Sequence, residues 1–465
     1  MKFFAQHGFW LALGPILVLH LLFPGDIPFL CDEPQLIDNA LQANAAGTLA
    51  ERGLLGTVGV HYGPQATWGY QALLAITDNL IAISVIKQLI SLALILSTLL
   101  FMAQRLALPR WPILIVLLSP QIHTYLRQLW DNVFLIPLSV VLLALALQFL
   151  HQPRRRWIVA MTAVVVLLGH IHLMTGILIL PIACVLCWQR RDWLLKNWRP
   201  TAATQAIGLA LSAPYLVGVC QAFGQASQAH ASRLDALLHA TCGASYFSFL
   251  YTTHSFPSLG KSHFVLAPTL TASLSWLSAL VIPIFFIGIF RALRSSQPDL
   301  QRSLAWICLG IVGLTLLFHG GGAHIFLPHY LNGQWFGFFF FIWIGAAWIT
   351  KYRLGQIASG AVVASLLLLL TATKLHVHAN QGNQSLAFGT TLSHQLELAD
   401  QLADYPRSTQ LFIAPGPMGT CAVSIRLLRA MQDREPTQSA PALYLYYQNT
   451  ISGTMVLAEK PPGGN

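Results

Sequence analysis

Three carboxylates stand where they could remove a proton from a substrate. Asp32 and Glu33 lie side by side behind the first apolar segment, in FLCDEPQLIDNAL, and Asp131 precedes a long apolar run in YLRQLWDNVFLIPLSV. A positioned carboxylate is a common general base, and ionisable groups at membrane depth are usually functional. The alternative is that these acids cap helices, with Pro34 marking a helix start and Arg127 pairing with Asp131. The residues alone leave both interpretations open.

Histidines form a second group of candidates. His170 and His172 alternate in LLGHIHLMTG, where they could contact a phosphate or bind a metal ion, although a hydrogen-bonded turn is the commoner role. His319, His324 and His329 recur at five-residue spacing, which does not place them on one helical face. We expect them in a loop near a polar cleft. A metal site needs further ligands, so we expect no cofactor, with a divalent metal ion as the less favoured alternative.

The composition is that of a membrane protein. Of 465 residues, 55% are hydrophobic and only 9% are charged, and the mean hydropathy is +0.60. A soluble domain carries about 25% charged residues. Apolar segments long enough, or nearly long enough, to cross about 30 Å of hydrocarbon recur along the chain. We predict eleven spans, at residues 8–24, 82–104, 110–124, 130–150, 157–171, 173–188, 202–223, 268–290, 301–319, 328–350 and 355–373.

The basic residues predict how these spans are oriented. Cytoplasmic connections are enriched in Lys and Arg, and alternate connections of this chain hold clusters of them. The clusters comprise Arg105, Arg110, Arg154, Arg155, Arg156, Arg190, Arg191, Lys196, Arg199, Arg291, Arg294, Arg302, Lys351 and Arg353. This pattern predicts a multi-pass protein of a bacterial-type inner membrane, with the N-terminus in the cytoplasm and the C-terminus outside. The net charge of +10 follows from this topology and implies no nucleic-acid partner.

Most acids and histidines map to the outer side. Two long loops, 24–80 and 224–267, and the glycine-rich stretch HGGGAHIFLPHYLNG could converge there over the bundle. In the first loop, apolar residues repeat every four positions, which predicts an amphipathic helix from Pro34 to Glu51 along the membrane surface. Tyr62 follows in GVHYGPQATWGYQALLAI, a stretch suited to the membrane interface and to a turn before a second short helix.

The composition changes again near residue 375. The pattern there predicts helices at residues 392–403 and 418–431, and strands at residues 410–414, 442–448 and 454–458. We therefore expect two domains. The first is a transmembrane module, residues 1–374, and the second is a small α/β domain outside the membrane, residues 375–465.

Together these features resemble the GT-C glycosyltransferases, polytopic enzymes that take sugars from polyprenyl-phosphate carriers. Within that superfamily the chain looks most like the group of protein O-mannosyltransferases and lipid A aminoarabinose transferases. The likeness rests on CDEPQLIDNALQANAAG and HYGPQATWGYQALL in the first outer loop, on YLRQLWDNVFLIPLSVVLLAL, and on PHYLNGQWFGFFFF at the tenth span. It implies a mainly α, GT-C-type helix bundle of about eleven spans with a small C-terminal α/β domain.

The resemblance also implies roles for particular residues. Asp32 matches the general base and Asp131 the acid that assists it, while Glu33 is kept as a third catalytic candidate. In PHYL, His329 stands before Tyr330 where the family more commonly has arginine, which departs from its phosphate-binding pattern. Candidates to bind the substrate or its phosphate are Arg52, Tyr62, Arg127, His170, His172, Arg233, Lys261, His329 and Tyr330.

The leading hypothesis is an inverting glycosyltransferase that acts at the outer face of the membrane. It would move a hexose or pentose from a polyprenyl-phosphate carrier to a hydroxyl, or a similar nucleophile, of a glycan, lipid or protein. One alternative is a proton-coupled transporter with Asp78, Lys87 and Asp131 as its relay, although no inverted repeat is apparent. Another is a non-catalytic membrane scaffold with a partner-binding outer domain, which would require residues 375–465 and not Asp32.

Overall fold

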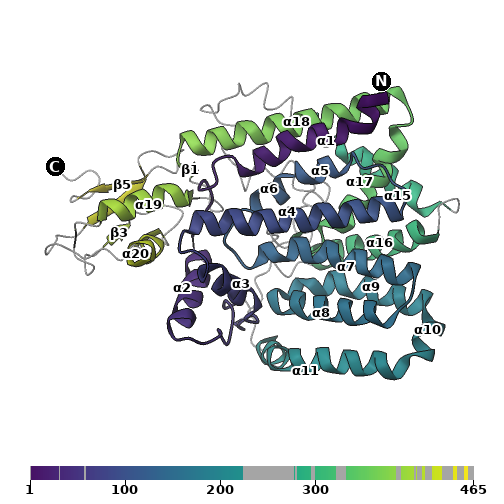
Figure 1. Cartoon of the computed structure of the whole chain (residues 1–465), viewed down its shortest axis with the longest axis horizontal. Helices are drawn as coiled ribbons and strands as arrows, with labels where there is room; N and C mark the ends of the chain where they lie inside the picture. The colour runs from purple at the N-terminus through teal and green to yellow at the C-terminus, as the bar shows by residue number, and fades with distance from the viewer. Residues whose placement is uncertain are drawn as a thin grey trace.

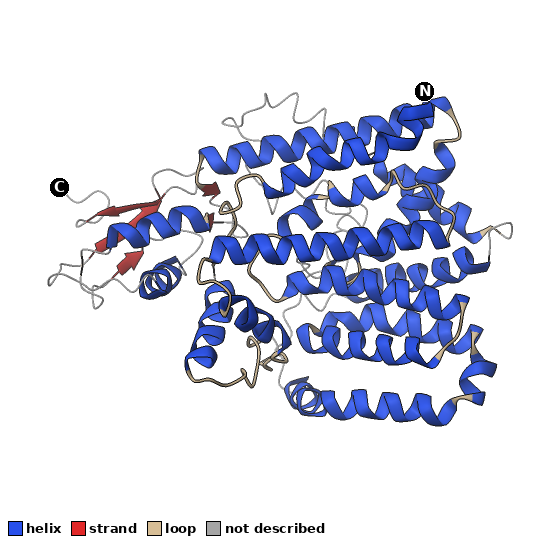
Figure 2. Ribbon diagram, viewed as in Figure 1, coloured by secondary structure: helices blue, strands red, loops and turns tan. Residues whose placement is uncertain are grey.

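The computed structural model is a bundle of apolar helices with a small α/β unit at one end (Figures 1 and 2). It describes residues 2–30, 32–56, 59–223, 277, 280–294, 299–320, 331–383, 389–402, 405, 411–413, 421–431, 443–447 and 455–458. Within these ranges, the helices long and apolar enough to cross a membrane are Leu80–Arg105, Asn132–His151, Asp299–Phe318 and Arg353–Ala379. Shorter apolar helices accompany them. The chain is an integral membrane protein, and the total of eleven spans stays a prediction.

The bundle is built mainly from ten helices of the described chain. They are α1 (Lys2–Leu21), α4 (Leu80–Arg105), α7 (Leu135–His151), α8 (Arg155–Ile171), α9 (Gly176–Gln189), α11 (Trp198–Phe223), α15 (Val281–Leu293), α16 (Asp299–Gly320), α17 (Trp335–Ile349) and α18 (Arg353–Ala379). The core contains α17, in which every residue from Trp335 to Ala346 is buried. A Cβ atom added at Gly345 would clash with the carbonyl oxygen of Ile284, so glycine allows α17 and α15 to touch backbone to backbone.

One predicted span is not a continuous helix. Residues 110–124 form two short helices, α5 (Ile113–Leu117) and α6 (Pro120–Tyr125). Between them Ser119 has an extended backbone, with ψ of 126°. Proline supplies no backbone N–H and disfavours a helical conformation in the residue before it, so Pro120 ends α5 and begins α6. This break places polar backbone groups inside the bundle, and they need partners from other helices.

The long connection between α1 and α4 carries two helices, α2 (Asp32–Ala45) and α3 (Gln65–Leu74). The predicted surface helix is therefore present, but it starts at Asp32 and ends six residues before Glu51. The chain turns at Gly47, whose φ of +64° is costly for other residues. Figure 1 shows α2 and α3 at the end of the bundle that carries the small α/β unit, opposite the N-terminus.

The C-terminal unit contains the helices and strands that the sequence predicts. They are α19 (Leu392–Gln401), β3 (Leu411–Ile413), α20 (Cys421–Met431), β4 (Leu443–Tyr447) and β5 (Met455–Ala458). Strand β4 is central, parallel to β3 and antiparallel to β5. A two-stranded ribbon, β1 (Gly382–Asn383) and β2 (Gly389–Thr390), precedes them and was not predicted. The prediction of a helical membrane bundle with a small α/β unit is confirmed.

The C-terminal unit also holds the segment that leads into α2. The Leu392 N–H donates to the carbonyl of Ile27 at 2.8 Å, and the side-chain amide of Gln395 donates to the carbonyl of Phe29 at 3.1 Å. Helix α20 packs on α2 as well. The residues just before Asp32 are thus fixed by groups near the other end of the chain.

Candidate active site

Asp32 is the first residue of α2, and Trp130, the residue before Asp131, binds its carboxylate. The indole N–H of Trp130 donates to Oδ2 of Asp32 at 3.1 Å. The phenol of Tyr70, on α3, donates to the Trp130 carbonyl at 3.0 Å. Burial raises the pKa of Asp32, and the Trp130 hydrogen bond opposes that rise. The structure therefore joins the two predicted acidic stretches through Trp130.

Glu33 is more deeply buried than Asp32. Its Oε2 accepts a hydrogen bond from the Leu30 N–H at 3.3 Å, which secures the turn into α2. Burial raises the pKa of Glu33 to about 8, and the charges of Asp32 and Asp131 contribute to the rise. At neutral pH its carboxyl is mostly protonated. Glu33 thus stabilises the start of the helix without adding a second full charge beside Asp32.

Asp131 completes the group of three acids and is only 2% exposed. Its Oδ1 accepts a hydrogen bond from the Asn132 N–H at 2.6 Å, at the start of a short 3-10 turn, Asn132–Phe134, that leads into α7. Asp131 can therefore cap this turn and belong to the group of three acids at the same time. No ion pair between Asp131 and Arg127 exists in the described part of the chain.

A wall of aromatic and histidine side chains adjoins the acids. The Tyr62 ring stacks on the His172 ring with centroids 5.2 Å apart. The ring centroid of Tyr215, on α11, lies 5.5 Å from that of His170. The Tyr215 hydroxyl is close enough to Asp131 to interact electrostatically with it. The structure therefore brings Tyr62, His170 and His172, three members of the predicted set, together around Tyr215, which interacts with Asp131.

The two histidines also attach the connection that carries α2 and α3 to the bundle. Nδ1 of His170 lies 2.6 Å from the side-chain amide of Gln65, and its carbonyl accepts from the Gly63 N–H at 2.8 Å. His172 caps the short 3-10 helix Leu173–Thr175 through the Met174 N–H at 3.2 Å. These are turn roles of the kind that the sequence allowed. Among the described residues, no group of three or more His, Cys, Asp or Glu side chains is arranged to hold a metal ion.

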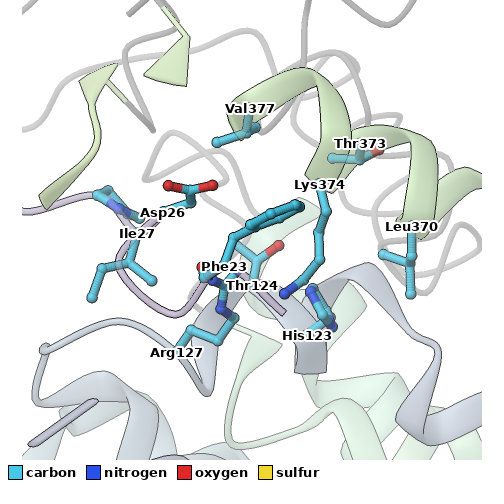
Figure 3. A pocket seen from close by; sticks show the side chains of 11 residues that line it. Phe23, Asp26, Ile27, His123, Thr124, Arg127, Leu370, Thr373, Lys374 and Val377 are labelled. Carbon is cyan, nitrogen blue, oxygen red and sulfur yellow. The ribbon is translucent and has the colours of Figure 1, made fainter. Parts of the chain in front are cut away.

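Arg127 faces a different polar cluster, at the end of α1 (Figure 3). Arg127 and Lys374 of α18 both donate to backbone carbonyls that follow α1, those of Phe23 and Leu22 respectively. Asp26 pairs with His378 at 3.0 Å on the rim of this cluster. Basic side chains are favourable at helix C-termini. Arg127 and Lys374 thus satisfy carbonyl groups that would otherwise be buried without partners.

The remaining predicted binding residues lie at the surface or outside the described ranges. Arg52 is exposed in the loop between α2 and α3. The other four, Arg233, Lys261, His329 and Tyr330, fall outside the residues that the structure describes. The predicted outer loop 224–267 falls there entirely. Their proposed contacts with a phosphate stay predictions.

A long apolar groove runs away from the aromatic wall between α8, α9 and α11. It consists of two adjoining hollows of about 480 and 630 Å³, which share Thr162, Val165, Ile179 and Gln205. The smaller hollow ends at His170 and Tyr215, and the larger one reaches Arg191 and Trp198. The groove therefore follows nearly the whole length of α8 and α11, and one end of it lies at Tyr215, which interacts with Asp131.

The helix bundle, the loop that carries α2 and α3, and the C-terminal α/β unit together form a fold that is known from membrane proteins. Two solved structures share it, both of ArnT from Cupriavidus metallidurans. The apo structure aligns with a TM-score of 0.54 at 13% identity, covering 95% of this chain and 93% of that chain. The structure bound to undecaprenyl phosphate aligns with a TM-score of 0.55 at 12% identity, covering 94% and 92%. No protein-family model and no curated protein matches the sequence.

Proposed function

We propose that this protein is an inverting glycosyltransferase that moves a sugar from a polyprenyl-phosphate carrier to an acceptor hydroxyl. The observation that carries the proposal is a groove nearly as long as a membrane helix in an ArnT-like fold. It ends at Tyr215, which interacts electrostatically with Asp131, and the neighbour of Asp131, Trp130, binds Asp32. A soluble sugar donor needs no such groove. A donor on a polyprenyl chain needs both a polar site at the interface and an apolar path leading from it.

Asp32 acts as the base in this proposal. Trp130 binds Oδ2 and orients the carboxylate, so that Oδ1 takes the proton of the acceptor hydroxyl as its oxygen attacks the anomeric carbon. The bond from that carbon to the phosphate breaks, and the electron pair leaves with the phosphate. Attack opposite the leaving group inverts the anomeric centre. Asp131, next to Trp130 in the chain, assists Asp32, and Glu33 positions Asp32.

The polyprenyl phosphate gains charge as it leaves, and cationic donors on the same side of the membrane stabilise it. Arg52, Arg233, Lys261 and His329 form the available pool, with Tyr330 beside His329. Arg127 contributes less directly in this arrangement, because it already binds carbonyl groups at the end of α1. The polyprenyl chain lies in the groove between α8, α9 and α11. One of the two ArnT structures holds undecaprenyl phosphate, which supports a carrier of this class.

The proposed topology puts the N-terminus in the cytoplasm of a bacterial-type inner membrane and the acids outside. Figure 1 supports it, because the N-terminus and the α/β unit lie at opposite ends of the bundle. The transporter alternative gains no support from the described contacts. Lys87 donates to the Leu126 carbonyl at 2.7 Å, while Asp78 is exposed at the start of α4, where Asn79 provides the cap.

The test of this function is transfer by purified protein in detergent or nanodiscs. The donors are undecaprenyl phosphates carrying radiolabelled hexoses or pentoses, and the acceptors are lipid, glycan and protein fractions of a bacterial envelope. We expect label to move to one acceptor class with release of undecaprenyl phosphate and inversion at the anomeric carbon. Proton-coupled uptake into proteoliposomes with no transfer from any donor would refute the proposal.

Trp130 offers a test of how the base is tuned. Trp130→Phe keeps an aromatic ring but removes the N–H that lowers the pKa of Asp32. We expect the pKa of Asp32 to rise, which moves the acid limb of the pH–rate profile to higher pH by up to about one pH unit. Trp68→Phe is the control, because the Trp68 N–H binds the Ala50 carbonyl and not an acid. Identical pH–rate profiles for the two variants would show that Trp130 does not tune the pKa of the base.

A further inference from the structure

A second groove lies between α4, α7 and α8, at the end of these helices remote from Asp32. It has a volume of about 480 Å³, and its apolar wall includes Leu94 and Phe101 of α4 and Val141 of α7. From Leu94 to Arg105, the last residue of α4, a helix rises about 16 Å. That is about half of the ~30 Å hydrocarbon thickness of a bilayer. The groove therefore has the depth of one leaflet.

Two arginines stand at the polar end of this groove. Arg105 ends α4, and Arg156 lies in the first turn of α8. Both are exposed, and their guanidinium groups lie over aromatic rings, 5.4 Å from Phe101 and 4.5 Å from Trp157 respectively. Neither forms an ion pair within the part of the chain that the structure describes. The end of the groove thus carries two positive charges with no described carboxylate opposite them.

Two buried polar atoms in the same lining also have no hydrogen-bond partner. They are the indole nitrogen of Trp157 and Oε1 of Gln148. Gln148 is only 7% exposed. One is a donor and the other an acceptor. An unsatisfied buried polar atom is costly, and it is rare unless a ligand or water completes it. A ligand of this groove should therefore offer both an acceptor and a donor near an anion.

We propose that the groove binds one anionic glycerophospholipid of the leaflet at this end of the bundle, which is the cytoplasmic leaflet in the proposed topology. The phosphate lies between Arg105 and Arg156, and an acyl chain lies along α4 and α7. A phosphate or ester oxygen accepts the Trp157 N–H, and a headgroup hydroxyl donates to Gln148. Phosphatidylglycerol offers all of these groups. Phosphatidylcholine lacks the hydroxyl and adds a cation that the arginines repel. The proposal is independent of sugar transfer, because the groove does not reach the acids.

Native mass spectrometry of the full-length protein tests this site. Protein stripped of lipid in detergent is titrated with palmitoyl-oleoyl phosphatidylglycerol or with the matching phosphatidylcholine. We expect one phosphatidylglycerol to bind wild-type protein in preference to phosphatidylcholine. Arg105→Gln combined with Arg156→Gln should weaken that binding roughly 10- to 30-fold. Trp157→Phe and Gln148→Met should each weaken it severalfold, because each removes one polar partner. The first keeps an aromatic ring beneath Arg156 and the second keeps a side chain of similar length.

The matched control is Arg199→Gln combined with Arg353→Gln. It removes the same charge from exposed positions outside the groove. We expect it to bind phosphatidylglycerol as the wild type does. An equal loss in both double variants would mean that the lipid responds only to net charge and would overturn the proposal. Equal binding of the two lipids by wild-type protein would overturn it as well. Melting temperatures in lipid-free detergent check that all variants are folded.

Discussion

Asp32→Asn is expected to lower the rate of sugar transfer at least about 100-fold and up to about 10,000-fold, the range over which general bases contribute. The change is nearly isosteric, and the amide oxygen can still accept the Trp130 N–H that now binds Oδ2. The variant should therefore fold and bind the polyprenyl-phosphate donor normally. Its defect should lie in kcat, because the group that takes the proton is missing while the groove is intact.

Asp38→Asn is the matched control for this variant. Asp38 lies on the same helix, six residues along, and its carboxylate binds the side chain of Gln42 at 2.7 Å. The same chemical change there should leave kcat within about twofold of wild type. Full activity of Asp32→Asn would remove Asp32 from the mechanism and direct attention to Asp131. Loss of donor binding along with activity would instead indicate a structural role.

Glu33→Gln is expected to stabilise the protein at alkaline pH. Burial, helped by the charges of Asp32 and Asp131, raises the pKa of Glu33 from 4.5 to about 8. The folded state therefore holds a proton between these values that the unfolded state has released, so stability falls as pH rises from about 4.5 to 8. The full loss is on the order of 4 to 5 kcal/mol for a buried carboxyl. A glutamine carries no proton to lose, so the variant should escape this loss.

The measurement is the melting temperature of the detergent-solubilised protein between pH 5 and pH 9. Wild type should lose stability across this window, and Glu33→Gln should lose less and exceed wild type at pH 9. Glu51→Gln is the control, since Glu51 is exposed in the loop after α2. This variant should have the melting temperature of the wild type at every pH. Parallel curves for wild type and Glu33→Gln would contradict the buried, protonated state that we assign to this residue.

The membrane fold and the position of Asp32 were predictable because both follow from local patterns. Long apolar runs define the helices, and the acidic pair behind the first run lies where the chain leaves α1, at the start of the next helix. The location of this pair on the outer side stays a prediction. The start of α2 at Asp32 agrees with the helix signal around Pro34. Burial and hydrogen bonds separate the roles of the pair, and the sequence does not show either of them, because Trp130 binds Asp32 from 98 residues away and α20 packs on α2 from the C-terminal unit.

The contacts of Arg127 could not be predicted from spacing. Four residues separate it from Asp131, which would bring the two side chains together only on a continuous helix. Helix α6 ends at Tyr125, however, and the next turn begins at Asn132, so Arg127 turns instead toward the carbonyl of Phe23. Tyr215 was missed for a related reason. A single tyrosine in an apolar span is unremarkable until the packing of α11 on α8 places it beside His170.

The backbone contacts between the start of the chain and α19 have a consequence for biosynthesis. Gln395, which binds the Phe29 carbonyl, follows it by 366 residues. At ribosomal rates of about 5 to 20 residues per second, the segment before Asp32 waits roughly 20 to 70 s for this partner. Asp32, the proposed base, is thus made long before the segment that leads into it is fixed in place. A nascent chain should therefore acquire the proposed activity only after α19 has been synthesised and has bound this segment.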